Sequence, residues 1–455
     1  MERHSSETPL CPFTPRTPMS PVAPAKRQIV VVLGGSFSGT FPSTHGSNFV
    51  GAHCAHMLAK TLPPSTLLLL IEQSSHMIHR FVLPRYSVYP SHEHKAFIPY
   101  SELLHNNEHD ANSHQHPLHC ESRVIQARAL RITNGHIDLD RPVKGFGTRV
   151  QYNYLVYALG AKLPGFLSSV VDSDKGSSIS WVQSLQVKIA KSTNVVVVGG
   201  GALGIQFASD IKERFPEKKV KLIHSRDRFL PLYDSAMHDR IFERLHTLGV
   251  EMFFNDRVTS SLSIIEGQHI VTTRSGLHFD CDLQLNCTGL QYNSALLASM
   301  SPQSLNLKNS CLHVLPTMQL ADSRYENIYV IGDVADTAAL KNAVSGWFQG
   351  EVVARNITRM VRKSDNSKPS QTTPSPSLPP NHGQSTLNPI ETDELESYVP
   401  GPPVIKLTVG KQTYLYQRPK PESLEPEVGF YEANEDLDAA VTWTMYGADT
   451  GDLFA

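Results

Sequence analysis

The sequence predicts an α/β protein with two doubly wound domains and a small C-terminal α+β domain. Two segments, residues 28–72 and residues 193–224, share one pattern: a β-branched run, a glycine cluster, a helix-like stretch and a further apolar strand. With 455 residues, the chain is also too long for one compact core and suits two or three domains. A strand that enters a helix through a glycine turn opens a nucleotide-binding domain, so two copies indicate two dinucleotide sites.

The second glycine cluster carries the clearest motif. Residues 195–206 read VVVVGGGALGIQ, a strand that enters a helix through G-x-G-x-x-G. Gly199 permits the tight turn, Gly201 lets the backbone approach a pyrophosphate, and Gly204 lets helix and strand pack closely. The N-terminus of the helix then faces the phosphates, where its free amides favour an anion. The flanking strand and helix favour a nucleotide site over an ordinary glycine-rich turn.

The strand after this helix ends without the acidic residue that usually binds the ribose of NAD. His224, Ser225 and Arg226 stand there instead. Because an arginine at this point can pair with a 2′-phosphate, the sequence favours NADPH over NADH by a modest margin. The alternative is that Arg226 is a solvated surface charge.

The first glycine cluster is interrupted. The run IVVVL leads into Gly34, Gly35 and Ser36, which begin a phosphate turn, but residues 38–49 are rich in residue types that favour turns over helix. A helix becomes plausible only at Gly51. Because deletion of residues 38–49 would join the turn directly to that helix, we interpret the segment as an insertion. We attribute it to a gene-model artefact such as an unspliced intron.

Several other strands end in residues that suit a bound nucleotide. Glu72 ends an apolar strand, where its carboxylate can accept hydrogen bonds from the adenosine ribose of FAD, unless it is merely a charge that ends a buried strand. Two further strands end in a small residue close to Gly160 or Gly289, which suits close passage of the backbone near a nucleotide. Asp333 follows Gly332 in the run IYVIGD, where it can bond a ribityl hydroxyl of FAD.

Composition excludes several classes of protein. With 41 Lys plus Arg against 43 Asp plus Glu and no basic run, the chain lacks the electrostatic footprint of a nucleic-acid binder. The longest apolar stretches are far shorter than the roughly 20 residues that span a bilayer. We therefore expect a cytoplasmic protein, with peripheral contact to a membrane or mitochondrion left open. The six cysteines show no CxxC and no CxxxxC spacing, which disfavours a redox disulfide and a metal site.

Two segments differ in composition from the rest. Residues 1–27 carry Pro, Ser and Thr with no apolar core, which predicts a disordered leader rather than a secretory signal. Residues 361–395 are rich in Pro, Ser, Thr and Asn, as is typical of a linker. After the linker, two strand-like runs around Gly410 predict a hairpin, and residues 435–446 predict a helix. Residues 396–455 therefore form the small α+β domain.

These motifs, in this order, resemble the FAD-dependent pyridine nucleotide oxidoreductases, and most closely the apoptosis-inducing-factor-like (AMID-like) branch. The most specific parts are the turn GGGALG, the strand ending LIHSR, the segment PTMQL and the run YVIGDVAD. The resemblance implies a glutathione-reductase-like fold, in which an NAD(P) domain interrupts an FAD domain and an interface domain follows. The implied boundaries are residues 28–185 and 291–360 for the FAD domain, 186–290 for the NAD(P) domain and 396–455 for the interface domain.

The resemblance also implies the cofactor contacts and the activity. It places Gly34, Ser36, Gly51 and Glu72 on the adenosine half of FAD, Asp333 on the ribityl chain, and Arg85 and Lys341 near the isoalloxazine. The implied activity passes hydride from NAD(P)H to flavin N5 and electrons on to a quinone-like or other small acceptor, with no catalytic side chain because the flavin carries the chemistry. The interrupted first turn motivates an alternative, a catalytically impaired nucleotide-binding or signalling protein of the same fold.

Overall fold

The computed structural model describes residues 27–35, 50–100, 103–104, 119–162, 174–259, 263–265, 268–366, 394–423 and 425–454. Its first domain is built on a five-stranded parallel sheet in the order β20-β9-β1-β2-β5. The strands are β1 (Gln28–Leu33), β2 (Thr66–Glu72), β5 (Glu121–Gln126), β9 (Tyr154–Tyr157) and β20 (Ile328–Val330). In β1, β2 and β9 the central residues are β-branched or leucine and are buried, as expected for strands covered on both faces, whereas β5 at the edge has exposed residues.

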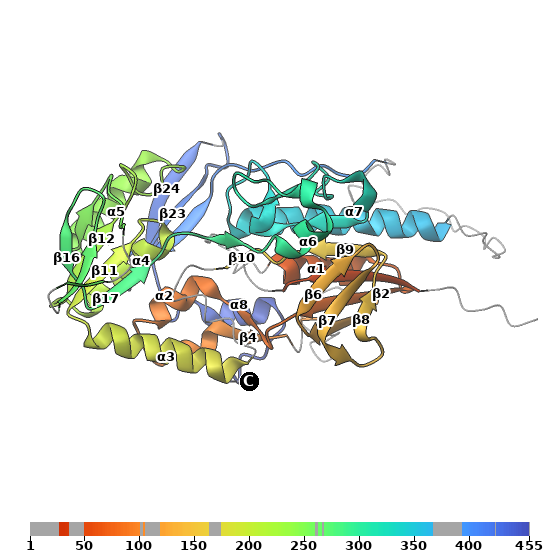
Figure 1. Cartoon of the computed structure of the whole chain (residues 1–455), viewed down its shortest axis with the longest axis horizontal. Helices are drawn as coiled ribbons and strands as arrows, with labels where there is room; N and C mark the ends of the chain where they lie inside the picture. Colours follow the sequence, from red (N-terminus) through yellow and green to blue (C-terminus); the bar gives the residue numbers. More distant parts are fainter. Residues whose placement is uncertain are drawn as a thin grey trace, which may run out of the picture.

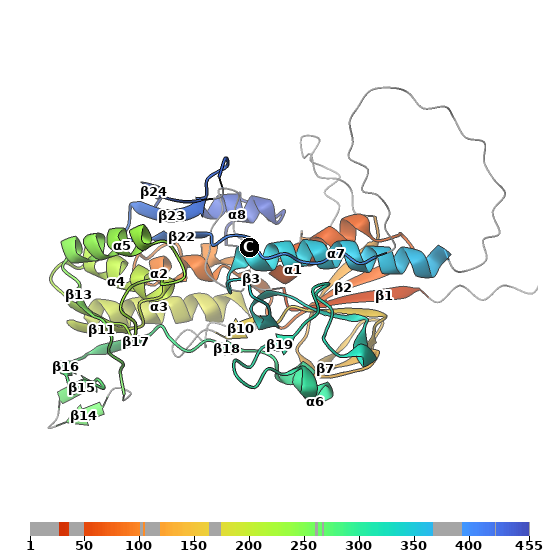
Figure 2. The ribbon, with the colours of Figure 1, turned by 90° about the horizontal axis from the view of Figure 1, so that it is seen from above.

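A second parallel sheet, in the order β13-β12-β11-β17, forms the second domain. Its strands are β11 (Asn194–Val198), β12 (Lys219–Ile223), β13 (Glu251–Phe253) and β17 (Leu283–Asn286), accompanied by α3 (Lys175–Lys191), α4 (Ala202–Arg214) and α5 (Ser235–Leu248). A small antiparallel sheet of β14 (Ser263–Ile265), β15 (Gln268–Thr272) and β16 (His278–Asp280) projects from this domain, as Figure 2 shows. The expected α/β class with parallel nucleotide-binding sheets is therefore present.

The chain passes between the two sheets twice. It leaves the first sheet through β10 (Ala161–Lys162) and returns through β18 (Gln291–Tyr292), and these two short strands pair antiparallel. Strand β20 then completes the first sheet, so the first domain is made of two chain segments. Figure 1 shows the second domain on the left and the first on the right. The predicted boundary at residues 185/186 falls inside α3 rather than in a loop.

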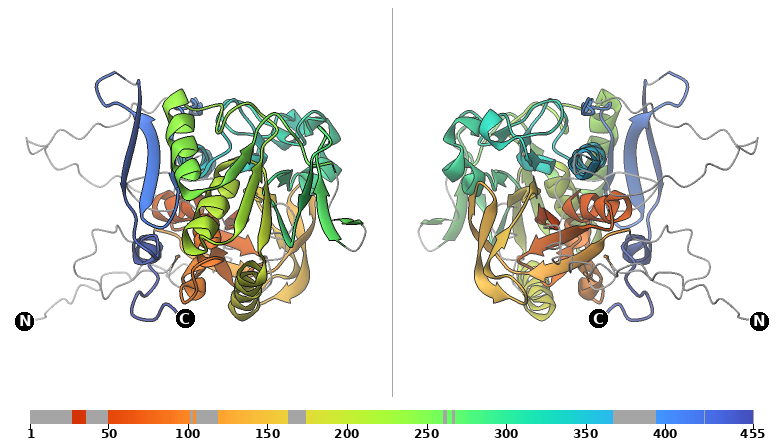
Figure 3. Two further views of the ribbon diagram at one scale, coloured as in Figure 1. Left: turned by 90° about the vertical axis from the view of Figure 1, so that its left-hand side faces the viewer. Right: turned by 90° about the vertical axis from the view of Figure 1, so that its right-hand side faces the viewer.

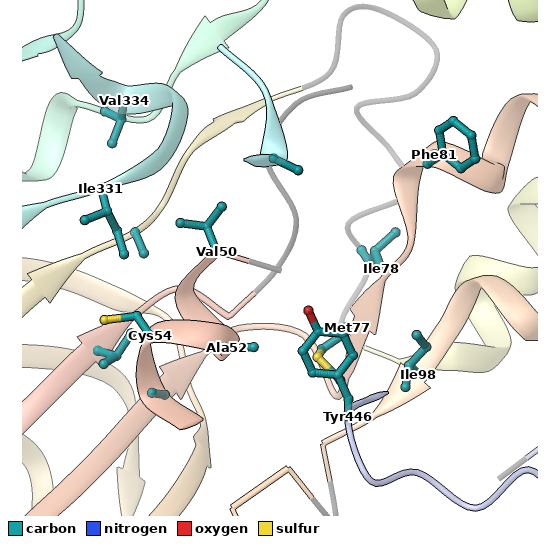
Figure 4. Packing of buried hydrophobic residues seen from close by; sticks show 14 of the residues in the cluster. Val50, Ala52, Cys54, Met77, Ile78, Phe81, Ile98, Ile331, Val334 and Tyr446 are labelled. Atoms are coloured by element: carbon teal, nitrogen blue, oxygen red, sulfur yellow. The ribbon is translucent and has the colours of Figure 1, made fainter. Parts of the chain in front are cut away.

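Two helices cover the first sheet where its strands end. Helix α1 (Val50–Thr61) packs along α7 (Ala343–Asn366), and Figure 1 shows the pair side by side. The contact is close near their N-termini, where a Cβ atom on Gly346 would lie 2.4 Å from a methyl carbon of Val50. Figure 4 shows Val50 and Cys54 of α1 in the same buried cluster as Ile331, which follows β20. This core holds the glycine turn before α1 and the end of β20 at one edge of the sheet.

The C-terminal domain differs in detail from the sequence prediction. The expected hairpin is present as β22 (Ile405–Thr408) and β23 (Thr413–Pro419), and a third strand, β24 (Pro426–Glu432), extends it. Figure 3 shows this blue sheet standing on one side of the molecule, next to α5. Helix α8 (Ala439–Met445) begins later than expected, because Asp438 has the left-handed φ of 58° and ends the turn before it.

Two further features were not anticipated. In the chain between β5 and β9, the strands β6 (Ala129–Thr133), β7 (His136–Val143) and β8 (Gly147–Gln151) form a separate antiparallel sheet. Helix α7 continues past Arg362 to Asn366, so the expected linker begins later than its composition indicated. Residues 367–393, together with the expected leader at residues 1–26, lie outside the described residues. Within the described residues, no helix combines the length and apolar character needed to cross a membrane.

Candidate nucleotide-binding sites

The first glycine turn retains its geometry on both sides of the interruption. Gly34 has a φ of 97°, in the region that favours glycine, and its amide donates to the carbonyl oxygen of Ile71 over 2.9 Å. A Cβ atom on Gly51 would lie 1.8 Å from the Gly34 carbonyl oxygen. Gly51 therefore occupies the position at which helix and strand meet most closely. Ser36 and the expected insertion at residues 38–49 lie outside the described residues.

The second turn has the same construction. Gly199 has a φ of 109°, and its amide donates to the carbonyl oxygen of Ile223 over 2.8 Å. A Cβ atom on Gly204 would lie 1.9 Å from the Gly199 carbonyl oxygen, whereas one on Gly201 would meet no protein atom within 4 Å. Gly204 is thus required by packing within the protein. Gly201 borders open space, as expected if the pyrophosphate of a ligand approaches the protein backbone there.

Strands β9 and β17, which each end in a small residue close to a glycine, contact these two turns. A Cβ atom on Gly34 would lie 2.7 Å from the carbonyl oxygen of Ala158, at the end of β9. In the second domain, a Cβ atom on Gly199 would lie 2.5 Å from Thr288, at the end of β17. Gly160 and Gly289, which follow these contacts, both adopt positive φ values, of 56° and 81°. The structure therefore brings the residues just before these two glycines, Ala158 and Thr288, against the predicted turns.

Glu72 organises the first turn. Its carboxylate is buried, and Oε2 accepts a hydrogen bond from the amide of Gly35 over 2.7 Å. Oε1 accepts from the amides of Gln73 and Ser74 over 2.8 and 3.2 Å. The same carboxylate borders a cavity of about 500 Å³. The residues around this cavity include Gly34, Glu72, Arg80, Ala158, Leu159 and Lys162. A cavity of this size at the end of parallel strands suits the adenosine half of a dinucleotide.

Arg80 is a residue that the sequence analysis missed. It follows β3 (His76–Ile78) in a short 3-10 turn, and its Nη1 donates to the carbonyl oxygen of Ala161 over 2.8 Å. Burial lowers its pKa, while the charges of Asp333 and Glu72 oppose this shift. Arg80 is thus near both Glu72 and Asp333, the two carboxylates predicted to contact FAD. No motif marks it in the sequence, because the contacts that place it come from distant segments.

Asp333 carries a polar atom without a protein partner. The side chain is 2% exposed, and Oδ1 has no hydrogen-bond partner among the described residues. Burial raises the pKa of Asp333 to about 6, against the opposing charges of Lys341 and Arg80. Gly332, with a φ of 78°, fixes the preceding bend, and its amide donates to Gln349 on α7 over 2.8 Å. A buried acceptor without a partner fits a ligand hydroxyl, and the ribityl chain of FAD supplies such groups.

The guanidinium of Arg85, a residue predicted to lie near the isoalloxazine, is engaged by protein groups. Its fully buried guanidinium pairs with Asp210 of α4, with Nε and Oδ2 3.0 Å apart. The two terminal nitrogens donate to the carbonyl oxygens of Lys411 and Gly410 over 2.9 and 2.7 Å. The short helix α2 (Leu83–Tyr86) turns Arg85 toward the second and C-terminal domains. Arg85 therefore links α2 to α4 and to the turn before β23.

Lys341 lies near Asp333 of the first domain, whereas His224 and Arg226 stand at the end of β12 in the second. Lys341 donates to the carbonyl oxygen of Ala335, and its charge acts to lower the pKa of Asp333. His224 is buried and accepts a hydrogen bond from the amide of Gly200 over 3.1 Å. Arg226 follows on the exposed turn. The described part of the chain thus brings His224 to the second glycine turn and leaves Arg226 open to a ligand.

The cysteines of the described residues form no redox pair. Cys54, Cys120, Cys281, Cys287 and Cys311 are all free thiols. Burial raises the pKa of each, to about 11 for Cys281, so the reactive thiolate form is disfavoured. The residues gathered at the two turns therefore fit nucleotides and give no indication of disulfide chemistry.

Comparisons with known proteins agree with this geometry. The family model of the pyridine nucleotide-disulphide oxidoreductases matches residues 46–351. Fe-regulated protein 8 of Mycosarcoma maydis is 32% identical over 90% of this chain and 95% of its own length. Ferroptosis suppressor protein 1 of Taeniopygia guttata is 27% identical over 72% of this chain and 79% of its own length. Apoptosis-inducing factor homolog B of Dictyostelium discoideum is 22% identical over 68% of this chain and 80% of that protein.

A solved structure shares the fold. The NAD-dependent persulfide reductase from A. fulgidus aligns with a TM-score of 0.56 at 18% identity and covers 87% of this chain. This chain spans 64% of that protein, less than two thirds of its length. The family model and the fungal relative each match well over half of the chain. The chain therefore belongs to the pyridine nucleotide-disulphide oxidoreductase family, in its apoptosis-inducing-factor-like branch, and is an FAD-dependent NAD(P)H oxidoreductase.

Proposed function

We propose that this chain transfers electrons from NADPH to a quinone-like acceptor. The observation that carries the proposal is an apolar groove that begins beside the residues predicted to hold the flavin. When bound, FAD supplies a two-electron carrier between the nicotinamide and the acceptor. The protein's own residues then have three tasks: to hold FAD, to hold the pyridine nucleotide and to receive the acceptor.

Four elements of the first domain would hold FAD. The glycine turn at Gly34 and Gly51 would receive the phosphates, and the Glu72 carboxylate would accept hydrogen bonds from the adenosine ribose. Arg80 would supply positive charge to the pyrophosphate. Asp333 would accept a hydrogen bond from a ribityl hydroxyl through the oxygen that has no protein partner among the described residues. These roles are supported by burial, by charge and by the close approach of helix and strand at Gly34 and Gly51.

The second glycine turn would hold the pyridine nucleotide. Gly201 borders open space at the N-terminus of α4, where backbone amides favour a pyrophosphate. Arg226 is exposed at the end of β12 and can pair with a 2′-phosphate. This arrangement supports a modest preference for NADPH over NADH.

The groove that receives the acceptor lies between the start of α7 and the C-terminal sheet. It has a volume of about 710 Å³, and Leu340 and Asn342 line one part of it. These two residues flank Lys341, whose charge acts on Asp333. The aromatic residues that line the groove are Phe348, Tyr398, Tyr416, Phe430 and Tyr431. An apolar groove with several ring faces suits a planar acceptor such as a quinone.

Lys406 lines the same groove and provides a proton donor. Its Nζ lies 3.8 Å from the ring centroid of Tyr414, and burial lowers its pKa to about 8. An ammonium group with this pKa can release a proton near neutral pH. Because reduction of a quinone to a hydroquinone consumes protons, we assign Lys406 the delivery of one proton from Nζ.

The test is oxidation of NADPH and NADH with a panel of quinones and with oxygen, in assays supplemented with FAD. We expect quinones to support turnover, and Phe348→Ala to raise the KM for quinone severalfold while NADPH binding is unchanged. Phe242→Ala is the matched control, because Phe242 is 40% exposed on α5 outside the groove, against 53% for Phe348. Equal effects of the two substitutions would refute the groove as the acceptor site. Turnover with oxygen but with no quinone would refute the acceptor class.

A further inference from the structure

Asp438 stands at the start of α8 but does not cap this helix. An aspartate at such a position usually has an extended backbone, and its carboxylate accepts a hydrogen bond from an amide of the first turn. Asp438 instead has a φ of 58°, and among the described residues its side chain makes no capping hydrogen bond. The preceding Leu437, which is buried, has a φ of 54°. Two adjacent non-glycine residues in the left-handed region are strained, so other contacts must hold this turn.

The contacts that hold the turn come from the same loop and from the first domain. The amide of Asp438 donates to Asp436 Oδ1 over 3.2 Å, and Asp438 Oδ1 accepts a hydrogen bond from the side chain of Asn434. Asp436 in turn pairs with Lys95 of the first domain, with Oδ2 and Nζ 2.8 Å apart. The carboxylate of Asp438 is therefore held in place by the turn rather than by the helix that follows it.

The charge of Asp438 acts on three side chains of the C-terminal sheet. Strand register places Tyr414 opposite Tyr431. Lys406 stands opposite Tyr416, which lies two residues along β23 from Tyr414 and so on the same face. Lys406 Nζ lies 3.8 Å from the ring centroid of Tyr414 and 4.9 Å from that of Tyr431. The charge of Asp438 acts on Lys406 and on both tyrosines. Ring faces and a carboxylate thus stabilise the charged ammonium group.

The other groups around Lys406 do not replace Asp438. Burial lowers the pKa of Lys406 to about 8, and the charge of Asp438 opposes this shift. His79 acts on Lys406 from the first domain, but burial lowers the pKa of His79 to about 3, so this histidine is neutral near neutral pH. The other titratable groups that line the groove or act on its tyrosines are Arg85, Tyr86, Tyr398, Tyr416, Arg418, Glu427 and Asp436. Among these carboxylates, Asp438 is the one whose charge acts on Lys406.

We propose that Asp438 is a positioning residue for reduction of the acceptor, because the strained turn holds its carboxylate where it keeps the Lys406 ammonium charged. The proposal rests on the proposed function, in which Lys406 supplies one proton from Nζ. Overall, NADPH, one proton and a quinone give NADP⁺ and a hydroquinone, and Lys406 then regains its proton from water. Because only the charged amine can give a proton, Asp438 extends proton delivery to higher pH.

The first test measures the titration of Lys406 in the purified full chain and requires neither flavin nor turnover. Competitive labelling of lysines with a trace of acetic anhydride at a series of pH values, followed by mass spectrometry, gives the pKa of Lys406. We expect a value of about 8 in the wild type. Asp438→Asn should lower it by about half a unit or more, because a nearby opposite charge is lost. Glu435→Gln is the matched control, since Glu435 lies in the same loop and pairs with Lys411.

The second test is the pH profile of quinone reduction, measured with added FAD. Because the reaction requires protonated Lys406, kcat should fall as pH rises through the pKa of Lys406. In Asp438→Asn this fall should move to lower pH by the same amount as the titration, while the KM for NADPH stays unchanged. A merely structural role for Asp438 would lower kcat at every pH without moving the profile.

The outcomes separate this inference from the proposed function. Equal titration of Lys406 in the Asp438→Asn and Glu435→Gln variants would overturn the role of Asp438. A shifted titration with an unshifted pH profile would also overturn it, because the proton would then come from another group. If the wild type reduces no quinone, the proposed function fails and this inference falls with it. Asparagine tolerates the left-handed region, so Asp438→Asn should fold, as thermal unfolding will show. If it does not, Asp438→Gly removes the same charge and tolerates the same φ.

Discussion

The backbones of Gly51 and Gly34 lie so close that a Cβ atom on Gly51 would stand 1.8 Å from the Gly34 carbonyl oxygen. The same relationship holds between Gly204 and Gly199, at 1.9 Å. Helix and strand therefore meet in the same way in both domains, although residues 36–49 separate the strand from the helix in the first. Substitution of Gly51 or Gly204 should therefore weaken the binding of one nucleotide at a time.

Alanine at these two positions should separate the two cofactors. The added methyl group must push α1 or α4 away from its strand, which displaces the amides that face the phosphates. We make both substitutions in the chain lacking residues 38–49, which we expect to carry flavin. Gly51→Ala should then purify with reduced flavin while it still binds 2′,5′-ADP, and Gly204→Ala should retain flavin and lose 2′,5′-ADP binding. Flavin absorbance and calorimetry measure both properties. Loss of both ligands in both variants would contradict the assignment of one nucleotide to each turn.

In the chain lacking residues 38–49, which we expect to carry flavin, Asp333→Asn should weaken FAD binding. A hydrogen bond from a ribityl hydroxyl to a charged oxygen contributes roughly 1.5 to 3 kcal/mol, so we expect the Kd for FAD to rise by about tenfold to a hundredfold. Flavin released per chain on denaturation measures this change. Full retention of flavin by the variant would count against Asp333 as a ligand.

The same substitution should stabilise the flavin-free protein above pH 6. Burial raises the pKa of Asp333 from 3.8 to about 6. Between these two pH values, the folded state keeps a proton on Asp333 that the unfolded chain has lost. The stability that this proton contributes is complete below pH 3.8 and is lost as pH rises through about 6. The difference approaches about 3 kcal/mol for two pKa units. Denaturant unfolding at pH 4 and pH 7 tests the sign, and a gain by the variant at pH 4 alone would refute it.

Arg85→Ala should destabilise the fold. The substitution leaves Asp210 buried without its partner, which costs about 3 to 5 kcal/mol. The double variant Arg85→Met with Asp210→Leu should recover part of that loss, because it removes the uncompensated charge. Thermal unfolding measures both effects. A normal unfolding temperature together with lost flavin would instead support a direct contact between Arg85 and the isoalloxazine.

Arg226→Ala should raise the KM for NADPH more than the KM for NADH. The exposed guanidinium can pair with the 2′-phosphate, which NADH lacks. Steady-state kinetics with each nucleotide measure the two constants. Equal changes would indicate that Arg226 is a solvated charge and that nucleotide choice does not depend on it.

The glycine clusters and apolar runs of the sequence predicted the turns and strand ends of the site, because these depend on neighbouring residues in the chain. Gly34, Gly199 and Gly332 adopt the positive φ values that glycine tolerates, and their neighbouring strands end where the sequence indicated. The roles of Arg80 and Arg85 depend on contacts more than 80 residues away in the chain, such as those with Ala161 and Asp210. Such contacts leave no periodic pattern in the sequence. The sequence likewise gives no sign of the left-handed turn at Leu437 and Asp438, because neither residue is a glycine.

The measurement that tests the account most directly is the visible spectrum of the chain with and without residues 38–49, before and after anaerobic addition of NADPH. Displacement of two amides from the pyrophosphate, at roughly 1.5 to 3 kcal/mol each, would weaken FAD binding by about a hundredfold or more. We predict that the full chain purifies with little flavin, and that the chain lacking residues 38–49 carries flavin that NADPH bleaches. Equal stoichiometric FAD in both would contradict the effect assigned to the insertion. A shortened chain without flavin, or with flavin that neither nucleotide reduces, would contradict the central claim and favour the impaired nucleotide-binding alternative.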